Sequence, residues 1–509
     1  MSTPKKQHEP LVQKIISICK QRGFIFQSSE IYGGLKSAYD YGPMGIELKR
    51  NIMNEWWTAM VYRREDIFGM DASILMHPKV WEASGHLARF TDPIVTCSNC
   101  KQKFRPDKQP IRTPGEEVEF VEAESRKKRK GTISEKHPYA CPECNGSLFN
   151  ETSQFNLMFR SSIGPTDPID QFLNHIEGKA FSRKELQDKL QEYLQPSVVY
   201  LRPETAQAMF VQFGNIWESQ AKPKLPFGIA QMGKSFRNEI TSEHFVFRTC
   251  EFEQMEMEYF IEPGTQEKWL KYWCEQRLNW WKALVNHPEK LRLRAHEPTE
   301  LAHYSDACFD IEYEYPWGWG ELEGIASRTD FDLKQHAQAS NAKNLKYFNP
   351  EKQGEDRWYY PYVVEPAAGA TRATLMFLLD AYTEIEGLDR EGNTKKREFL
   401  KLNPRLAPYK VAVFPLIRKA EHQQYARTVI EKFLAAGIHG KYDETSAIGK
   451  RYARHDEIGT PFCLTIDDET LSGENKDTVT LRYRDTTEQI RISIDRAVSE
   501  VVKRLHEQD

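Results

Sequence analysis

The sequence lacks two features that would each assign a protein to a broad class. It has no hydrophobic run near the roughly 20 residues that cross a bilayer, and its formal net charge is only −4. A nucleic-acid surface must therefore be local. The first residues, MSTPKKQHEP, also lack the apolar core of a secretory signal. These absences predict a cytoplasmic protein without membrane contact.

The 509 residues are 39% hydrophobic and 28% charged, which favours a globular protein of two or three domains. Residues 97–150 differ in composition and include a charged stretch (EEVEFVEAESRKKRKGTISEK), for which we expect a solvated loop. Residues 165–195 predict a small helical insertion, and 198–260 alternate like strands. After residue 403, alternating strand and helix signals predict a separate α/β domain.

Cysteine is not used in the pattern of a disulfide framework. Of nine cysteines, five are scattered, as in a reduced intracellular protein. The other four form two C-x-x-C pairs separated by 40 residues: Cys97, Cys100, Cys141 and Cys144. Four thiolates suit a tetrahedral Zn²⁺ without an open position, so we expect a structural zinc site. The alternative is four reduced, buried cysteines.

Residues Gly228–Ser235 (GIAQMGKS) match the phosphate-binding pattern G-x-x-x-x-G-K-[ST]. A phosphate-binding loop of this type is followed by a helix whose free N–H groups hold the phosphate. The following residues, FRNEITSE, have no helical apolar stripe. We therefore expect a strand here and reject the P-loop interpretation.

The FRNE segment offers a second kind of chemistry. Arg237 and Glu239 are two residues apart, so on a strand both point to one face, where an arginine can bind a phosphate or carboxylate. Arg248, Glu251 and Phe252 follow, and a strand returning with an aromatic residue can cover a nucleotide base. The alternative for FRNE alone is a surface salt bridge.

The motifs together resemble the class II aminoacyl-tRNA synthetases, and within them the glycyl-tRNA synthetases of the single-polypeptide, homodimeric type. SFRNEIT and EFEQMEMEYF are similar to motif 2 of this class, and GATR (369–372) to motif 3. The resemblance covers nearly the whole chain and includes YDYGPMG (39–45), RPETAQ (202–207), GWGELEGIASRTDFDLKQH (318–336), EPAAG (365–369) and RYARHDEIGTPFC (451–463). The class I motifs H-x-G-H and K-M-S-K-S are absent.

The resemblance implies an α+β catalytic domain (1–400) built on an antiparallel sheet. It would contain a zinc-ribbon-like insertion (97–150) and a helical insertion (165–195), and an α/β anticodon-binding domain (405–509) would follow. The implied reaction is activation of glycine by ATP and transfer to the 3′ end of tRNA(Gly). One alternative is a synthetase for serine, threonine, proline or histidine. Another is a non-catalytic RNA-binding relative, which typically loses the ATP-binding arginines present here.

The resemblance also implies residue roles. Arg237 would hold the α-phosphate and the glycine carboxylate, and Arg248 the outer phosphates. Phe252 and Arg372 would enclose the adenine. Mg²⁺ would bind Glu321, with Glu251 as a second candidate. The implied catalytic residues are Arg237, Glu239 and Arg372. The implied ATP-binding residues are Arg237, Asn238, Glu239, Phe247, Arg248, Thr249, Glu251, Phe252, Glu321, Leu322, Gly369 and Arg372.

Glycine offers an ammonium with three donors, so a ring of acceptors suits it. The implied glycine-binding residues are Arg105, Glu204, Glu256, Glu365, Ala367 and Gly369. Larger amino acids would be excluded by overpacking. Two positions depart from the family pattern: Ala367 replaces a serine, and Cys250 stands where relatives often have arginine.

Two further features each allow two interpretations. The basic run at 126–130 is either a solvated loop or a phosphate contact to the tRNA acceptor stem. Trp56 and Trp57 lie either near a dimer contact or in the core.

Overall fold

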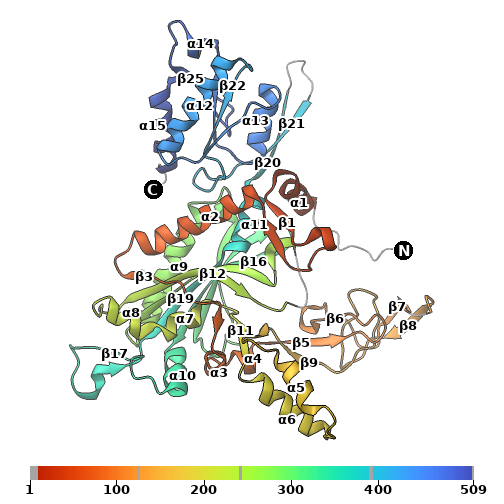
Figure 1. Ribbon diagram of the computed structural model, residues 1–509. Helices are drawn as coiled ribbons and strands as arrows, with labels where there is room; N and C mark the ends of the chain where they lie inside the picture. Colours follow the sequence, from red (N-terminus) through yellow and green to blue (C-terminus); the bar gives the residue numbers. More distant parts are fainter. Residues whose placement is uncertain (1–9, 124, 240–243, 389–393, 507–509) are drawn as a thin grey trace.

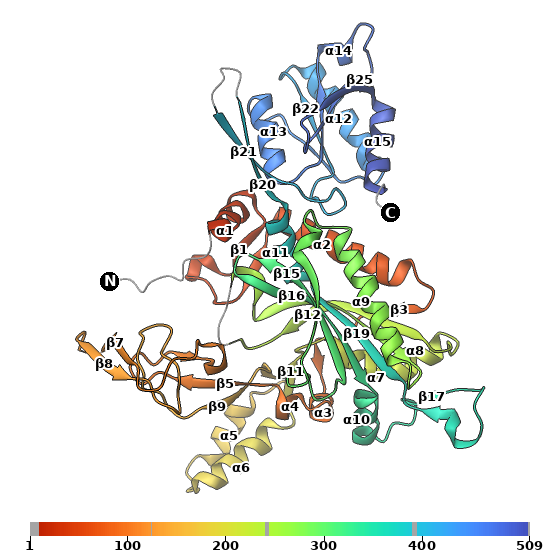
Figure 2. The same cartoon turned by 180° about the vertical axis from the view of Figure 1, so that it is seen from behind.

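The computed structural model describes residues 10–123, 125–239, 244–388 and 394–506. The chain forms a large unit around a seven-stranded sheet and, beyond the hairpin β20–β21, a smaller unit around a five-stranded sheet (Figures 1 and 2). Within the described ranges, no helix combines the length and apolar character needed to span a membrane.

The large sheet has the strand order β14-β15-β16-β19-β13-β12-β3. Its pairs are antiparallel except β3–β12, which is parallel. The expected antiparallel sheet is thus present. The strands are β3 (Ile67–Gly69), β12 (Phe227–Phe236), β13 (Glu251–Ile261), β14 (Leu291–Ala295), β15 (Ala307–Tyr315), β16 (Gly318–Thr329) and β19 (Tyr362–Gly369).

Three helices cover one face of this sheet: α2 (Pro43–Trp57), α9 (Gln266–Lys282) and α11 (Ala370–Ala381). Met255 and Met257 of β13 pack in the same core as Trp273 and Trp281 of α9. Trp56 is fully buried in this core, so the core interpretation is confirmed for that residue. Trp57 is half-buried beside it.

The same sheet has a second apolar cluster on the side of α7 (Ala206–Val211), α8 (Phe213–Ser219) and α10 (Phe331–Ser340). Phe210 and Phe213 pack there against Phe227 and Phe260.

The remaining helices and strands of the large unit are α1 (Pro10–Arg22), β1 (Ile25–Gln27), β2 (Tyr39–Tyr41), β4 (Leu75–Met76), α3 (Pro78–Ala83), α4 (His86–Arg89), β10 (Arg160–Ser162), β11 (Val198–Leu201), β17 (Tyr347–Phe348) and β18 (Trp358–Tyr359).

The GIAQMGKS segment lies inside β12 and pairs with β13 along its whole length. Residues Phe227 to Gln231 of β12 are buried. Lys234 forms an ion pair with Glu251 of the neighbouring strand. The expectation of a strand rather than a phosphate-binding loop is confirmed.

The insertion (97–150) projects from the large unit (Figure 1) and contains β6 (Lys103–Phe104). It is flanked by β5 (Thr91–Thr96) and β9 (Ser153–Asn156), which pair with each other. Our expectation of a loop for the charged stretch was wrong: it forms the hairpin β7 (Glu117–Val121) and β8 (Lys128–Thr132). Val118 packs with Ile133 and Ala140 in a small apolar cluster. The charged residues around these apolar positions had favoured the loop interpretation. The helical insertion is present as α5 (Pro168–Ile176) and α6 (Arg183–Leu194).

The smaller unit has the strand order β23-β22-β24-β25-β26. Helices α12 and α15 pack on one face around Val413 and Leu464, and α13 packs on the other against Phe414. The elements are β20 (Tyr382–Leu388), β21 (Thr394–Leu400), β22 (Val411–Pro415), α12 (Ala420–Ala435), β23 (Gly440–Tyr442), α13 (Ile448–Glu457), β24 (Phe462–Ile466), α14 (Asp468–Leu471), β25 (Thr478–Tyr483), β26 (Gln489–Ser493) and α15 (Ile494–His506).

Candidate active site

A cavity of about 470 Å³ lies on the large sheet, on the face away from α9. Side chains alternate between the two faces of the sheet along β13. Gln254 and Glu256 therefore face the cavity, while Met255 and Met257 face the helices. The cavity is lined by all the residues implied to bind ATP or glycine except Asn238 and Glu251.

Glu251 and Asn238, the two exceptions, lie outside the cavity lining. Glu251 pairs with Lys234 outside the cavity lining, on the opposite side of β13 from Phe252. Asn238 donates its backbone N–H to the carbonyl oxygen of Leu157 at 2.8 Å. The structure therefore does not bring these two residues to the cavity.

Strand β12 ends at Phe236, so Arg237 and Glu239 follow the strand, contrary to our expectation. The chain turns there, because the N–H of Glu239 bonds to the carbonyl of Arg237 at 2.7 Å. Both side chains still line the cavity. The Arg237 guanidinium lies between the rings of Phe90 and Phe252, 5.3 Å from each centroid. Residues 240–243, which include the end of SFRNEIT, lie outside the described residues.

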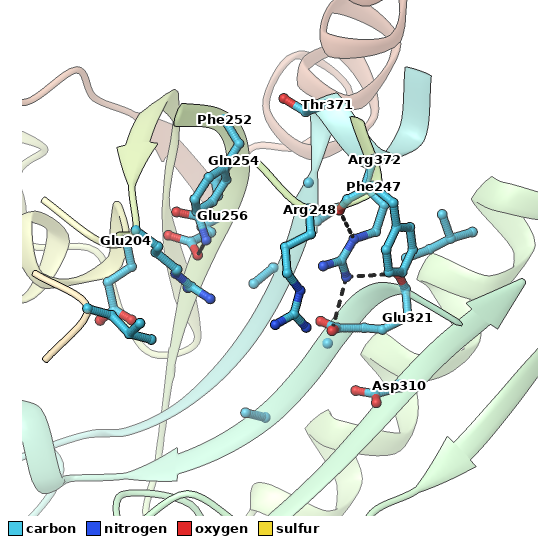
Figure 3. Close-up of a pocket in the computed structure, with 18 of the residues that line it drawn as sticks. Glu204, Phe247, Arg248, Phe252, Gln254, Glu256, Asp310, Glu321, Thr371 and Arg372 are labelled. Carbon is cyan, nitrogen blue, oxygen red and sulfur yellow. Dashed lines mark hydrogen bonds and ion pairs between the residues drawn. The ribbon is translucent and has the colours of Figure 1, made fainter. Parts of the chain in front are cut away.

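One end of the cavity combines Arg248 and Arg372 with the ring of Phe247 and the carboxylate of Glu321 (Figure 3). Arg372 donates to the carbonyl and carboxylate oxygens of Glu321 at 2.9 and 3.0 Å. Its guanidinium lies 4.5 Å above the ring of Phe247. Desolvation acts to raise the pKa of Glu321, but Arg372, together with Arg237 and Arg248, holds the pKa below its usual range. The Nη1 atom of Arg248 lies 3.4 Å from Oε2 of Glu239.

A β-bulge decides which acids of β16 face this end. Glu312 of β15 pairs with Glu321, whereas its neighbour Ile311 pairs with Glu323, so one residue of β16 is extra. Glu321 therefore faces the cavity. Glu323 faces α9 instead, where it accepts hydrogen bonds from Arg277 at 2.7 Å and Trp281 at 2.6 Å.

Two ionisable residues that the sequence did not predict, the acid Asp310 and the base His296, lie beside Glu321. Asp310 and Glu321 both approach Gly324 of the cavity floor. His296 contacts Asp310 at 2.8 Å, and burial, together with the charge of Glu321, raises the pKa of Asp310. The oxygen donors of Glu321 and Asp310 fit the ligand chemistry of Mg²⁺.

The other end of the cavity is rich in carboxylates: Glu204, Glu256 and Glu365 line it, on elements far apart in sequence. Burial, reinforced by Glu365 and Glu204, raises the pKa of Glu256 to about 7. Burial also acts to raise the pKa of Glu204, but His86 and Arg328 reverse the effect and lower it. Glu256 accepts a hydrogen bond from the N–H of Thr205 at 2.8 Å.

The sequence reasoning missed Arg328, the cation at this end. It donates to Glu365 at 2.8 Å and to Asp332 at 2.9 Å, and Tyr304 stacks over it at 3.9 Å. Gln207 joins Glu204 to Asp332, at 3.0 and 2.9 Å. The signal available in the sequence was the i, i+4 spacing of arginine and aspartate in SRTDFD.

Arg105 reaches the cavity from the insertion. It donates to Asp92 at 2.5 Å and to Asp107 at 2.7 Å, and both Arg105 and Asp92 line the cavity. Ala367 lies opposite Gly324 in the β16–β19 ladder, so two small residues form part of the floor.

The four cysteines of the insertion converge. The Sγ atoms of Cys97 and Cys144, and those of Cys100 and Cys141, are 3.6 Å apart, and all four lie within 4.8 Å of one another. Sulfurs around a tetrahedral zinc ion, with bonds of about 2.3 Å, are about 3.8 Å apart. The donor set and its spacing therefore fit zinc.

Comparisons with known proteins agree with this geometry. Residues 410–504 match the family described as "Anticodon binding domain". The chain is 43% identical over 496 residues to a glycine–tRNA ligase of Treponema denticola, covering 97% of both chains. It is 45% identical over 498 residues to one of Streptomyces coelicolor, covering 97% of this chain and 98% of that one. It is also 45% identical over 490 residues to one of Acetivibrio thermocellus (96% and 97%). Identity at this level over nearly the full length shows that the chain belongs to the glycine–tRNA ligase family.

Proposed function

We propose that the cavity joins glycine to ATP, giving glycyl-adenylate and pyrophosphate, and that glycine then passes to the 3′ end of tRNA(Gly). The observation that supports this best is the polarity of the cavity. Arg248, Arg372 and Phe247 gather at one end, and Glu204 and Glu256 lie at the other (Figure 3). Arg237 and Glu365 also line the cavity. A nucleotide triphosphate and an amino acid with a free ammonium are complementary to these two ends.

ATP would lie at the arginine end. Arg248 would contact the outer phosphates, and Mg²⁺ bound by Glu321 and Asp310 would supply positive charge to them. Phe252 and Arg372 would enclose the adenine, with Arg372 held on the ring of Phe247. Arg237 would hold the α-phosphate next to the glycine carboxylate. Glu239, Thr249, Leu322 and Gly369 complete the proposed ATP site, and Asn238 is left out because it does not line the cavity.

Glycine would lie at the carboxylate end, its ammonium facing Glu204, Glu256 and Glu365. Larger amino acids would be excluded by overpacking against the buried acids. Arg105 and Ala367 would lie close to the bound amino acid. No protein nucleophile is needed, because the glycine carboxylate itself attacks the α-phosphorus.

We also propose a structural zinc ion at the four cysteines, and a homodimer in the cytoplasm. Residues 405–509 would bind the anticodon of the tRNA. The metal site is separate from the cavity lining, which supports a structural rather than catalytic role.

The test is amino-acid-dependent exchange of pyrophosphate into ATP without tRNA. Glycine, alanine, serine, threonine and proline are compared at equal concentrations. We expect exchange with glycine alone. Exchange with another amino acid would overturn the glycine site but keep the reaction class. No exchange with any of them would favour a non-catalytic RNA-binding protein.

A further inference from the structure

Glu258 is a buried acid that the proposed reaction does not use. It lies on β13 two residues after Glu256, and its side chain is fully buried, with 0% exposure. Alternation along the strand places it on the carboxylate side of the sheet, opposite to Met257 and Tyr259. It is not among the residues that line the cavity.

The pairing of two strands places Glu258 directly against a residue of the cavity. In the antiparallel β13–β19 ladder, Glu256 lies opposite Ala367 and Tyr259 lies opposite Val364. The same register sets Glu258 opposite Glu365. Directly opposed residues share one face, with Cβ atoms about 5 Å apart, and like charges so placed repel each other.

Among the described residues no cation forms an ion pair with Glu258, although the charge of Arg328 acts to lower its pKa. The nearby cation, Arg328 of β16, already donates to Glu365 at 2.8 Å and to Asp332 of α10 at 2.9 Å. The other charged groups that face Glu258 are acids: Glu365, Asp332 and Glu256. Among the described residues, no N–H or hydroxyl group donates to either oxygen of Glu258. A buried carboxylate without a partner is strongly unfavourable and takes up a proton instead.

We propose that Glu258 is a neutral carboxylic acid and that its O–H donates to Glu365, which stays ionised and faces the cavity. Burial, reinforced by Glu365, raises the pKa of Glu258 well above its usual range, in agreement with this assignment. Burial also raises the pKa of Glu365, and the hydrogen bond from Glu258 acts against that rise. Glu258 is thus a positioning residue, and its role rests on the proposed binding of the glycine ammonium by Glu365.

A neutral donor suits this position better than a second cation. A lysine or arginine here would neutralise Glu365 and compete with the substrate ammonium. A carboxylic acid occupies one oxygen of Glu365 and leaves its charge available. The arrangement fixes the orientation of Glu365 without weakening its attraction for glycine.

The test compares three variants of the full-length protein in pyrophosphate exchange. Glu258→Gln keeps a neutral donor, Glu258→Met keeps the volume without a donor, and Glu256→Gln is the matched control two residues away on the same strand. We expect Glu258→Gln to change KM for glycine by less than about twofold and Glu258→Met to raise it about tenfold, with KM for ATP unchanged in both. Glu256→Gln should raise KM for glycine at least tenfold, by loss of a charge.

Two outcomes would overturn the proposal. If Glu258→Gln raises KM for glycine as much as Glu256→Gln, Glu258 acts as an anion. If Glu258→Met leaves KM for glycine unchanged, the O–H donor is not needed. If Glu256→Gln has no effect, the glycine site itself is misassigned, and the protonation of Glu258 is decided by the following measurement.

Infrared spectroscopy tests the proton directly and needs no activity. At about pH 9, the spectrum should contain the carbonyl stretch of a protonated carboxyl group, and Glu258→Gln should remove it. Absence of such a band from the difference spectrum would refute a neutral Glu258, whatever the kinetics show.

Discussion

Arg328 donates from Nη1 to Glu365 at 2.8 Å while its Nε donates to Asp332 at 2.9 Å, and all three side chains are buried. One planar guanidinium therefore fixes two carboxylates on different elements, β19 and α10. This contact sets the position of Glu365 at the carboxylate end of the cavity.

Replacing this guanidinium tests its geometry separately from its charge. We expect Arg328→Lys to raise KM for glycine about tenfold and to lower the free energy of unfolding by about 2 kcal/mol, because an ammonium lacks the planar, spread donors that hold the two carboxylates in this geometry. Exchange kinetics and denaturant unfolding measure the two effects. Arg292→Lys is the control, since Arg292 is exposed and outside the cavity lining. Equal effects of the two substitutions would contradict the prediction.

Arg237 and Lys234 separate the two interpretations of GIAQMGKSFRNE. Arg237→Ala should reduce exchange by at least about 100-fold, since it removes a preorganised charge at the reacting phosphate. Lys234→Ala should change it less than about twofold, because Lys234 lies on the surface paired with Glu251. A larger loss from Lys234→Ala than from Arg237→Ala would revive the P-loop interpretation. The measurement is kcat for exchange at saturating glycine and ATP.

Glycine binding should depend on pH through Glu256, whose pKa is raised to about 7 mainly by burial. Below pH 7 the carboxyl is mostly neutral and attracts the ammonium weakly, and above it the charge is present. We therefore expect kcat/KM for glycine to rise with pH through this range. Glu256→Gln should abolish this dependence while lowering the value throughout. An unchanged pH profile in Glu256→Gln would assign the titration to another group.

The bulge in β16 predicts opposite effects for two acids of the same strand. Glu323→Ala leaves Arg277 buried without its partner and should lower the free energy of unfolding by about 3–5 kcal/mol. Glu321→Ala should affect stability little, by less than about 1 kcal/mol, but should raise the Mg²⁺ concentration needed for exchange. Denaturant unfolding and a magnesium titration distinguish them. Similar losses of stability would mean that both acids face the helices.

Zinc content tests the four-cysteine site. We expect one zinc ion per chain by elemental analysis, and none in Cys141→Ser, because a three-thiolate site holds the ion less tightly. Cys250→Ser, a half-buried cysteine outside this cluster, should keep the metal. Chelation should also lower the melting temperature of the wild type and not that of Cys141→Ser. Zinc retained in Cys141→Ser would contradict the assignment.

Much of this arrangement was predictable from local pattern. The alternation within residues 198–260 predicted strands, and β13, which is formed by this segment, has an acidic and an apolar face. The paired C-x-x-C motifs predicted the thiol cluster, because their spacing brings two sulfurs together within each turn. The absence of a helical stripe after GIAQMGKS excluded a phosphate-binding loop for the same local reason.

The charged hairpin β7–β8 was missed because charge dominates its composition, while its pairing depends on contacts with residues far along the chain. Asn99 of one cysteine turn donates to the carbonyl of Val121 at 2.9 Å, and Asn145 of the other donates to that of Glu119 at 3.0 Å. Arg328 was missed because its partner carboxylates come together only in the folded chain.

The sequence by itself determined which acids, arginines and cysteines the site can use. It also determined the order of strands and helices, since these depend on neighbours along the chain. Only the tertiary structure decided which acids meet. A single extra residue in β16 turns Glu321 toward the cavity and Glu323 toward Arg277. The two acids are only two residues apart, in GELEG, and on a regular strand they would share one face. The register of β13 against β19 sets Glu258 opposite Glu365, more than a hundred residues away. Strand register depends on packing across the whole sheet, so the protonation of these acids is a property of the fold and not of the local sequence.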